Sequence, residues 1–181
     1  MSMYPRLLGI AAVVFGFCLS KTLAAGDVGK GSWKFEMDRF DRPWISYYDT
    51  RGKTVFRFGC GTHFEIYAVY PGGAPTPDHT TASITITNGK TQMDFAGFII
   101  LLDGPGSEGW PPNTTMFNQP DLGYADDDDD PQYEKKWRAL ENRFLGLLDS
   151  GRPLTISAEG KSYLMPPLNA PRWRARFQKI C

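Results

Sequence analysis

The chain has 181 residues, of which 41% are hydrophobic, 22% charged and 14% aromatic, and its 20 Lys and Arg balance 20 Asp and Glu. This composition supports a folded core, so it excludes intrinsic disorder over most of the chain, a strongly basic nucleic-acid-binding protein and a multi-span membrane protein. Fourteen Pro and nineteen Gly indicate many turns and short elements, and the length indicates one domain.

The first segment has the pattern of an export signal. Residues 1–6 carry one positive side chain, 7–19 form an uncharged apolar run, and small residues follow. We expect residues 1–24 to be a cleaved secretory signal peptide. An apolar run of 13 residues is shorter than the roughly 20 that span a bilayer, so we expect no stable membrane insertion after cleavage. The mature domain, 25–181, then has 18 basic and 20 acidic residues, and this small charge gives no reason to expect nucleic-acid binding.

Strand patterns dominate the first half of the mature chain. Apolar and polar side chains alternate, or β-branched and aromatic residues cluster, in segments that we expect to be strands: 32–38, 44–48, 54–58, 63–70 and 83–87. Between them, 71–78 is a loop on its Gly and Pro content.

Asn88-Gly89 is the strongest turn signal in the chain. Because both residues tolerate positive φ, it predicts a two-residue type I′ hairpin that joins 83–87 to a strand at 90–95. The continuous apolar run at 98–102 predicts a separate, buried strand.

A long loop and one helix follow. Residues 103–130 hold four Gly, four Pro and seven Asp, which predicts a loop of unusual length. One apolar stripe of helical spacing then predicts an amphipathic helix over about 131–149; its members are Tyr133, Trp137, Leu140, Phe144 and Leu147 or Leu148. Asp130 is placed as an N-cap, Pro131 suits the first turn, and Gly151 is placed to end the helix.

Three strands are expected to close the chain, at 154–158, 163–165 and 173–181. The order of elements predicts a mainly β fold, an antiparallel β-sandwich or barrel with the single helix packed on it.

The cysteines predict one disulfide. Cys18 leaves with the signal, and the remaining pair, Cys60 and Cys181, each lie on the apolar face of an expected strand. Closing a loop of 120 residues would stabilise the fold by roughly 4–5 kcal/mol on a chain-entropy argument.

The acidic run 126–130 has two interpretations. Alternate carboxylates of Asp126, Asp128 and Asp130 could converge on a calcium ion, although the run does not match the EF-hand pattern. Alternatively, the run is a solvated loop whose charge favours the N-terminus of the following helix.

Two groups of residues are candidates for contact with a partner. On the expected last strand, Arg172, Arg174 and Arg176 alternate with aromatic residues and could grip a phosphate or carboxylate, or simply form a polar sheet face. In the long loop, Trp110, Phe117 and Tyr124 suit a partner-binding surface, or fold back to cover the sheet.

Catalytic signatures are weak. The G-x-G-x-x-G match at 104–109 is not followed by a helix, and the two histidines, His63 and His79, show no triad or metal pattern. A secreted hydrolase or a metal-dependent enzyme that uses acidic residues of 103–130 is therefore the alternative function.

The sequence also resembles a group of small exported proteins of Gram-negative bacteria. The shared features are an early Trp33 strand, Phe58-Gly59-Cys60, a late G-x-x-L-x-I segment at 151–156 and a closing F-x-x-x-C at 177–181. The pattern is similar to the invasion-associated locus B type and to the small periplasmic proteins encoded with type VI secretion systems, and only the long loop 103–130 departs from it. This resemblance implies a β-sandwich binding or accessory protein without catalytic residues.

Together these features predict an exported, non-catalytic binding or accessory protein of the bacterial cell envelope, periplasmic or secreted, which binds a protein or envelope partner. A structural envelope component is a third class. No cofactor is expected beyond the calcium considered at 126–130.

Overall fold

A computed structural model describes residues 29–60, 64–72, 80–102, 109–111, 114–119, 131–168 and 173–180. The strands are β1 (Ser32–Met37), β2 (Pro43–Tyr48), β3 (Thr54–Cys60), β4 (Phe64–Val69), β5 (Thr80–Thr87), β6 (Gln92–Leu102), β7 (Thr114–Gln119), β8 (Leu154–Ala158) and β9 (Lys161–Met165). The helices are α2 (Pro131–Leu148) and α3 (Trp173–Ile180).

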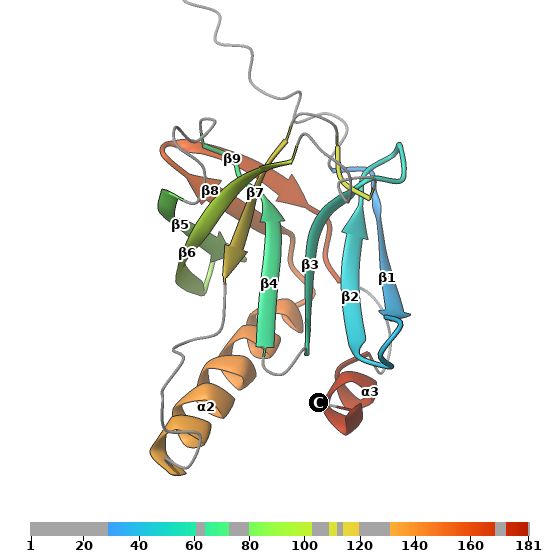
Figure 1. The fold of residues 1–181 in the computed structure, drawn as a ribbon, viewed down its shortest axis with the longest axis vertical. Coiled ribbons are helices and arrows are strands. Elements are labelled where there is room, and N and C mark those ends of the chain that lie inside the picture. The colour runs from blue at the N-terminus through green and yellow to red at the C-terminus, as the bar shows by residue number, and fades with distance from the viewer. Residues whose placement is uncertain are drawn as a thin grey trace, which may run out of the picture.

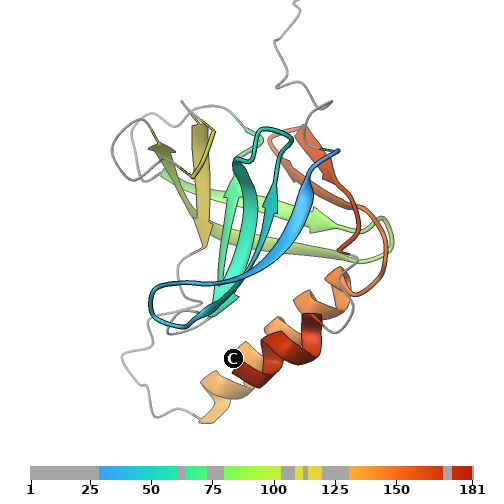
Figure 2. The same cartoon turned by 90° about the vertical axis from the view of Figure 1, so that its right-hand side faces the viewer.

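Within the described ranges the nine strands form one antiparallel sheet, in the order β1-β2-β3-β4-β7-β6-β5-β8-β9. The sheet curls into a half-barrel, and both helices lie at one end of it (Figures 1 and 2). Near the two edges of the sheet, the indole Nε1 of Trp33 in β1 donates a hydrogen bond to the carbonyl of Pro166, just after β9, at 3.0 Å. The predicted mainly β fold with a packed helix is thus confirmed, and α3 is added to it.

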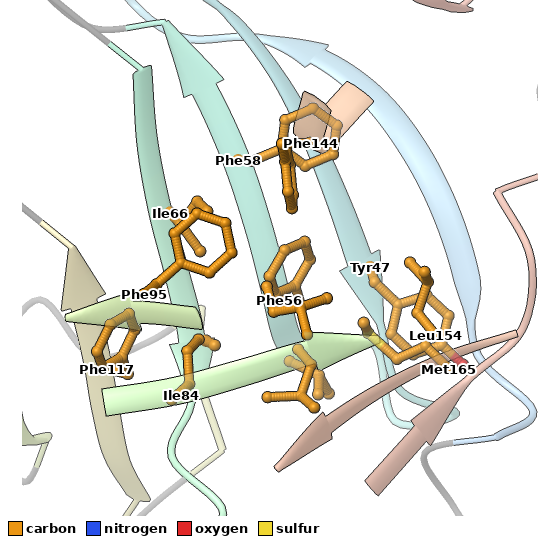
Figure 3. Close-up of a cluster of buried hydrophobic side chains, with 14 of the residues drawn as sticks. Tyr47, Phe56, Phe58, Ile66, Ile84, Phe95, Phe117, Phe144, Leu154 and Met165 are labelled. Atoms are coloured by element: carbon orange, nitrogen blue, oxygen red, sulfur yellow. The ribbon is translucent and has the colours of Figure 1, made fainter. Parts of the chain in front are cut away.

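Strand register gathers most of the buried apolar side chains on one face of the sheet, which we call the inner face. Phe58, for example, pairs with Ile45 of β2 and Ile66 of β4. Figure 3 shows side chains of this face, among them Phe58, Ile66 and Ile84, gathered together with Phe144. The largest side chains with less than 2% exposure are Tyr47, Phe56, Phe58, Phe64, Phe117, Phe144, Phe177, Ile45, Ile66, Ile84, Ile86 and Leu145.

Helix α2 confirms the predicted helix at 131–149. The ring of Phe144 reaches the inner face, with its centroid 5.2 Å from that of Phe58 and 5.1 Å from that of Phe64. Gly151 follows at φ 64°, a left-handed conformation that commonly ends helices. The C-terminal part of the apolar stripe, Phe144, Leu147 and Leu148, is therefore buried as the sequence predicts.

The strand predicted at 173–181 is wrong, because residues Trp173–Ile180 form the helix α3. Trp173 and Phe177 are four residues apart, a spacing that places two side chains on the same face of either a strand or a helix. Ala175 distinguishes the two structures: a strand would bury it between the aromatic residues, and here it is exposed. The rings of Trp173 and Phe177 pack on Phe58, with 6.0 and 5.4 Å between the ring centroids.

The long loop predicted at 103–130 is also partly wrong, since β7 lies within it. This strand pairs with β4 on one side and β6 on the other, in the middle of the sheet. Its run Thr114-Thr115-Met116-Phe117 has good strand residues, but flanking prolines conceal the signal.

The two-residue turn expected at Asn88-Gly89 is not formed. Thr87 pairs with Gln92, so the connection has four residues, and only Gly89 among them has a positive φ. The Asn88 side chain instead accepts hydrogen bonds from the backbone N–H groups of residues 90 and 91. Positive φ at two successive turn residues occurs at Glu159-Gly160, between β8 and β9.

The segment 98–102 is not a separate strand but the end of β6. It is not fully buried either, because Phe98 faces outward and is 39% exposed. An unbroken apolar run hides the alternation of faces that the strand in fact has.

Candidate binding surface

Two of the loop aromatics proposed for partner binding are buried. Phe117 has no exposed surface and belongs to the core, and Trp110 is only 8% exposed. The Gly109 carbonyl accepts a hydrogen bond from the backbone N–H of Thr54 at 2.7 Å, which anchors the Trp110 segment beside β3. Phe117 thus lies within the sheet as part of β7, and Trp110 packs beside β3. Tyr124 lies outside the described residues.

The arginine stripe is also corrected. Arg174 and Arg176 are two positions apart on a helix, and hence about 200° apart around its axis, so they do not share a face. Arg174 Nη1 forms an ion pair with Asp149 Oδ2 at 2.8 Å, and the guanidinium of Arg176 lies 4.0 Å from the ring centroid of Phe35. Arg174 thus links α3 to the end of α2, and Arg176 links it to β1. Arg172 is outside the described residues.

Other predicted site residues lie outside the description. These are Asp126, Asp128, Asp130, Cys181 and the side chain of Cys60, so the calcium site and the disulfide stay predictions. In the ranges that are described, no group of three or more His, Cys, Asp or Glu side chains could hold a metal ion.

The structure brings together a group of residues that the sequence analysis missed, on the outer face of the sheet. Register places Arg57 of β3 beside Tyr67 of β4, Tyr67 beside Asn118 of β7, and Asn118 beside Phe98 of β6. Each alternates with an inward-facing residue of its strand, so the four share the outer face.

A glycine makes room for the next member of the group. Trp44 pairs with Gly59, and a Cβ on Gly59 would lie 2.5 Å from the Trp44 ring and 2.8 Å from the carbonyl oxygen of Pro43. The indole therefore lies flat over the β3 backbone, where it is 6% exposed. From there it reaches Tyr67, with 5.7 Å between the ring centroids. Gly59 thus determines where the Trp44 ring lies.

Arg57 lies among three aromatic rings. Its guanidinium carbon is 4.5 Å from the ring centroid of Trp44, 4.8 Å from that of Tyr67 and 6.0 Å from that of Trp110. These are cation–π distances. We call Trp44, Arg57, Tyr67 and Trp110 the Arg57 niche.

Two buried polar atoms, one in the niche and one on the neighbouring Asn118, have no hydrogen-bond partner among the described residues. The Nε of Arg57 is buried and has no acceptor, and the buried Oδ1 of Asn118 has no donor. No ion pair found among the described residues involves Arg57. Such unmet buried groups are rare in folded proteins and are commonly met by a ligand, a partner or water.

The acid nearest in sequence to Tyr67 is already engaged. The Tyr67 hydroxyl donates a hydrogen bond to Glu65 Oε2 at 2.9 Å. Burial, followed by this bond and the negative charge of Glu65, raises the pKa of Tyr67 to about 12. The phenol therefore stays protonated at neutral pH and keeps Glu65 as its acceptor.

The turn between β1 and β2 lies next to the niche. Asp38 accepts hydrogen bonds from the backbone N–H groups of Phe40 and Arg42 at 2.8 and 3.0 Å, and Asp41 has φ 58°. Burial acts to raise the pKa of Asp38, but these bonds, with those from the Arg42 and Trp44 side chains, hold it well below its usual range. The Trp44 bond, from Nε1 to Asp38 Oδ2 at 3.3 Å, joins the turn to the niche.

Phe40 projects from this turn and is 62% exposed, the most of any large apolar side chain described. The guanidinium groups of Arg39 and Arg42 lie 4.7 and 5.1 Å from its ring centroid. An aromatic ring held by a rigid turn loses little conformational freedom on binding, which favours contact with a partner. We call Phe40 and the Arg57 niche together the Arg57 surface.

Comparison with protein-family models, curated proteins and solved structures found no match. Neither helix in the described part of the chain is long and apolar enough to cross a membrane. The described fold defines a mainly β protein, one antiparallel sheet with two helices.

Proposed function

We propose that the chain is an exported, non-catalytic binding or accessory protein of the bacterial cell envelope, and that it binds a protein partner through the Arg57 surface. The observation that carries this proposal is the partly buried guanidinium of Arg57, which three aromatic rings hold on the outer face while its Nε has no acceptor. A group that the fold holds in place but leaves unpaired is suited to pairing with a partner.

The export component rests on the sequence of residues 1–24 and on the resemblance to small exported proteins of Gram-negative bacteria. An exported chain with Cys60 and Cys181 is expected to form one disulfide. Fractionation of the native cell and mass spectrometry test both points. We expect a chain cleaved near Ala24 outside the cytoplasm, with neither cysteine alkylated before reduction. A full-length cytoplasmic chain with two free thiols would contradict export.

The binding component is tested by site-specific photocrosslinking in the native cell. A photoreactive residue replaces Phe40 in one variant and, as a matched control, Leu164 on the edge strand β9, which is 51% exposed. We expect a covalent adduct with one envelope protein from position 40 but none from position 164. The adduct from position 40 should disappear when Arg57→Gln is added.

No adduct at position 40, or one that Arg57→Gln leaves unchanged, would show that this surface is not the binding site. Equal adducts at both positions would show nonspecific contact and would reject the proposal in the same way.

A further inference from the structure

We propose that the Arg57 niche receives a carboxylate, supplied by an acidic side chain of a protein partner. This inference rests on the proposed function, because it names the chemical group that the Arg57 surface recognises. It follows from the geometry of the guanidinium, from the surrounding charges and from Asn118 of β7, whose buried Oδ1 has no hydrogen-bond donor.

The aromatic rings restrict how an anion can approach. The guanidinium carbon lies over the rings of Trp44 and Tyr67, 4.5 and 4.8 Å from their centroids, and the two centroids are only 5.7 Å apart, so both rings lie toward the same side of the group. The N–H groups of a guanidinium lie in its plane and point outward as a fork. An acceptor that pairs with these N–H groups comes in the plane of the fork, and a planar carboxylate matches it with two parallel hydrogen bonds.

The acids around the niche have other partners. Glu65 accepts from the Tyr67 hydroxyl at 2.9 Å. Asp38 forms an ion pair with Arg42 at 2.7 Å and accepts from the Trp44 indole at 3.3 Å. The positive charge of Arg57 thus faces its surroundings without an ion pair among the described residues. Partial burial strengthens the attraction of this charge for an incoming anion.

Asn118 favours a polypeptide over a phosphate as the source of the anion. Its buried Oδ1 needs a donor, and it lies one strand beyond Tyr67 in the row that begins with Arg57. A protein segment brings a carboxylate together with N–H donors, whereas an ionised phosphodiester group brings acceptors alone. Exposed Phe98, the next residue of the row, and exposed Phe40 add apolar contact area that suits a protein.

Nuclear magnetic resonance of the mature chain tests this inference. The Arg57 Nε–H signal is followed during titration with acetyl-Glu-N-methylamide, with the neutral match acetyl-Gln-N-methylamide, and with inorganic phosphate. We expect a saturable shift with the glutamate probe, and binding about tenfold weaker or more with the glutamine probe, since charge-assisted hydrogen bonds are about twice as strong as neutral ones.

Variants assign the binding to the fork of Arg57. Arg57→Gln should abolish the shift of the Trp44 and Trp110 indole signals that accompanies binding. Arg57→Lys, which keeps the charge but loses the fork, should bind more weakly than the wild type and more tightly than Arg57→Gln. The control Arg152→Gln, at an exposed arginine in the loop after α2, should bind as the wild type does.

The inference would be overturned if the glutamate probe caused no saturable shift of the Arg57 Nε–H signal. It would also be overturned if the probe shifted the Trp44 and Trp110 indole signals equally in the wild type and in Arg57→Gln. Phosphate that binds as tightly as the glutamate probe would also overturn it and would indicate a phosphate-bearing ligand. The proposed function can survive either result: if the crosslink from position 40 still depends on Arg57, the surface binds a partner through a group other than a carboxylate.

Discussion

Strands β2, β3 and β4 present two different aromatic surfaces, one on each face of the same sheet. On the inner face, Phe58 contacts rings from the sheet and from both helices: Phe56, Phe64, Phe144, Trp173 and Phe177. On the outer face, Arg57 also lies among rings, but its Nε has no acceptor. The inner face is thus completed by the chain itself, while the outer face still has a group to pair. The contrast indicates that the inner residues maintain the fold and that the outer residues are available for recognition.

The largest effect is expected from two neighbouring substitutions on opposite faces. Phe58→Ala should lower the free energy of unfolding by about 3–5 kcal/mol, because it leaves a cavity among aromatic rings. Arg57→Met should lower it by less than about 1 kcal/mol, since the lost cation–π attraction is offset by removal of an unsatisfied N–H. Urea denaturation measures both.

Phe58→Leu extends the comparison if Phe58→Ala does not fold, and it should still cost more than Arg57→Met. If Arg57→Met proved as destabilising as the Phe58 variants, Arg57 would be a residue of the fold, and the distinction between the two faces would be wrong.

An intermediate effect on stability is expected at Gly59. This residue lies in β3 next to Phe58, and the Trp44 ring of the Arg57 niche packs against it. Gly59→Ala forces a methyl group against the Trp44 ring and the Pro43 carbonyl, and should cost about 1–3 kcal/mol. It should also shift the Trp44 indole signal and weaken the glutamate probe. Gly146→Ala is the matched control: no atom lies within 4 Å of its added Cβ on α2, so it should stabilise the protein by about 0.5–1 kcal/mol. A Gly59→Ala variant with normal stability and an unmoved indole would show that Trp44 is not held by this contact.

The inner face could be predicted from the sequence because its information is local. Alternation over five to eight residues marks which side chains of a strand point inward, and the part of the helical stripe at Phe144, Leu147 and Leu148 marks the buried side of α2. Local spacing failed where two structures satisfy it equally, as with Trp173 and Phe177 in α3. It failed again where prolines flank a strand, as at β7.

The outer niche could not be predicted, because its members come from separate strands and meet only through register. Trp44, Arg57 and Tyr67 each occupy an ordinary outward position, and nothing near them in sequence distinguishes Arg57 from other exposed arginines. Trp110, which the sequence analysis named as a candidate for partner contact, joins them from the segment predicted to be a long loop. The one local hint is Gly59 inside a strand, since a glycine there commonly marks the close approach of another group.

The smallest effect on stability is expected from ionisable groups. The pKa of Asp38, near the niche, and that of Glu141, against the core, are shifted in opposite directions. Near the niche, hydrogen bonds hold the pKa of Asp38 below its usual range despite the opposing effect of burial. Against the core, Glu141 of α2 is only 6% exposed, and burial raises its pKa above the ordinary 4.5 although Arg138 and Arg174 oppose the shift. Since the ionised form of Glu141 is less favourable in the folded state, its contribution to stability is lowest above its folded pKa and increases as the pH falls toward 4.5.

Glu141→Gln removes this dependence, and the difference from the wild type isolates it from the other carboxylates. The variant should be the more stable protein at pH 8, by thermal unfolding, and its advantage should disappear by about pH 4, where the wild-type carboxyl is protonated as well. Asp41→Asn, at an exposed turn residue with positive φ that asparagine also tolerates, should show no such trend. A Glu141→Gln variant that is less stable than the wild type at pH 8 would mean that the charge of Glu141 pairs productively with Arg138 or Arg174. The inner side of the molecule would then depend on an ion pair as well as on apolar packing.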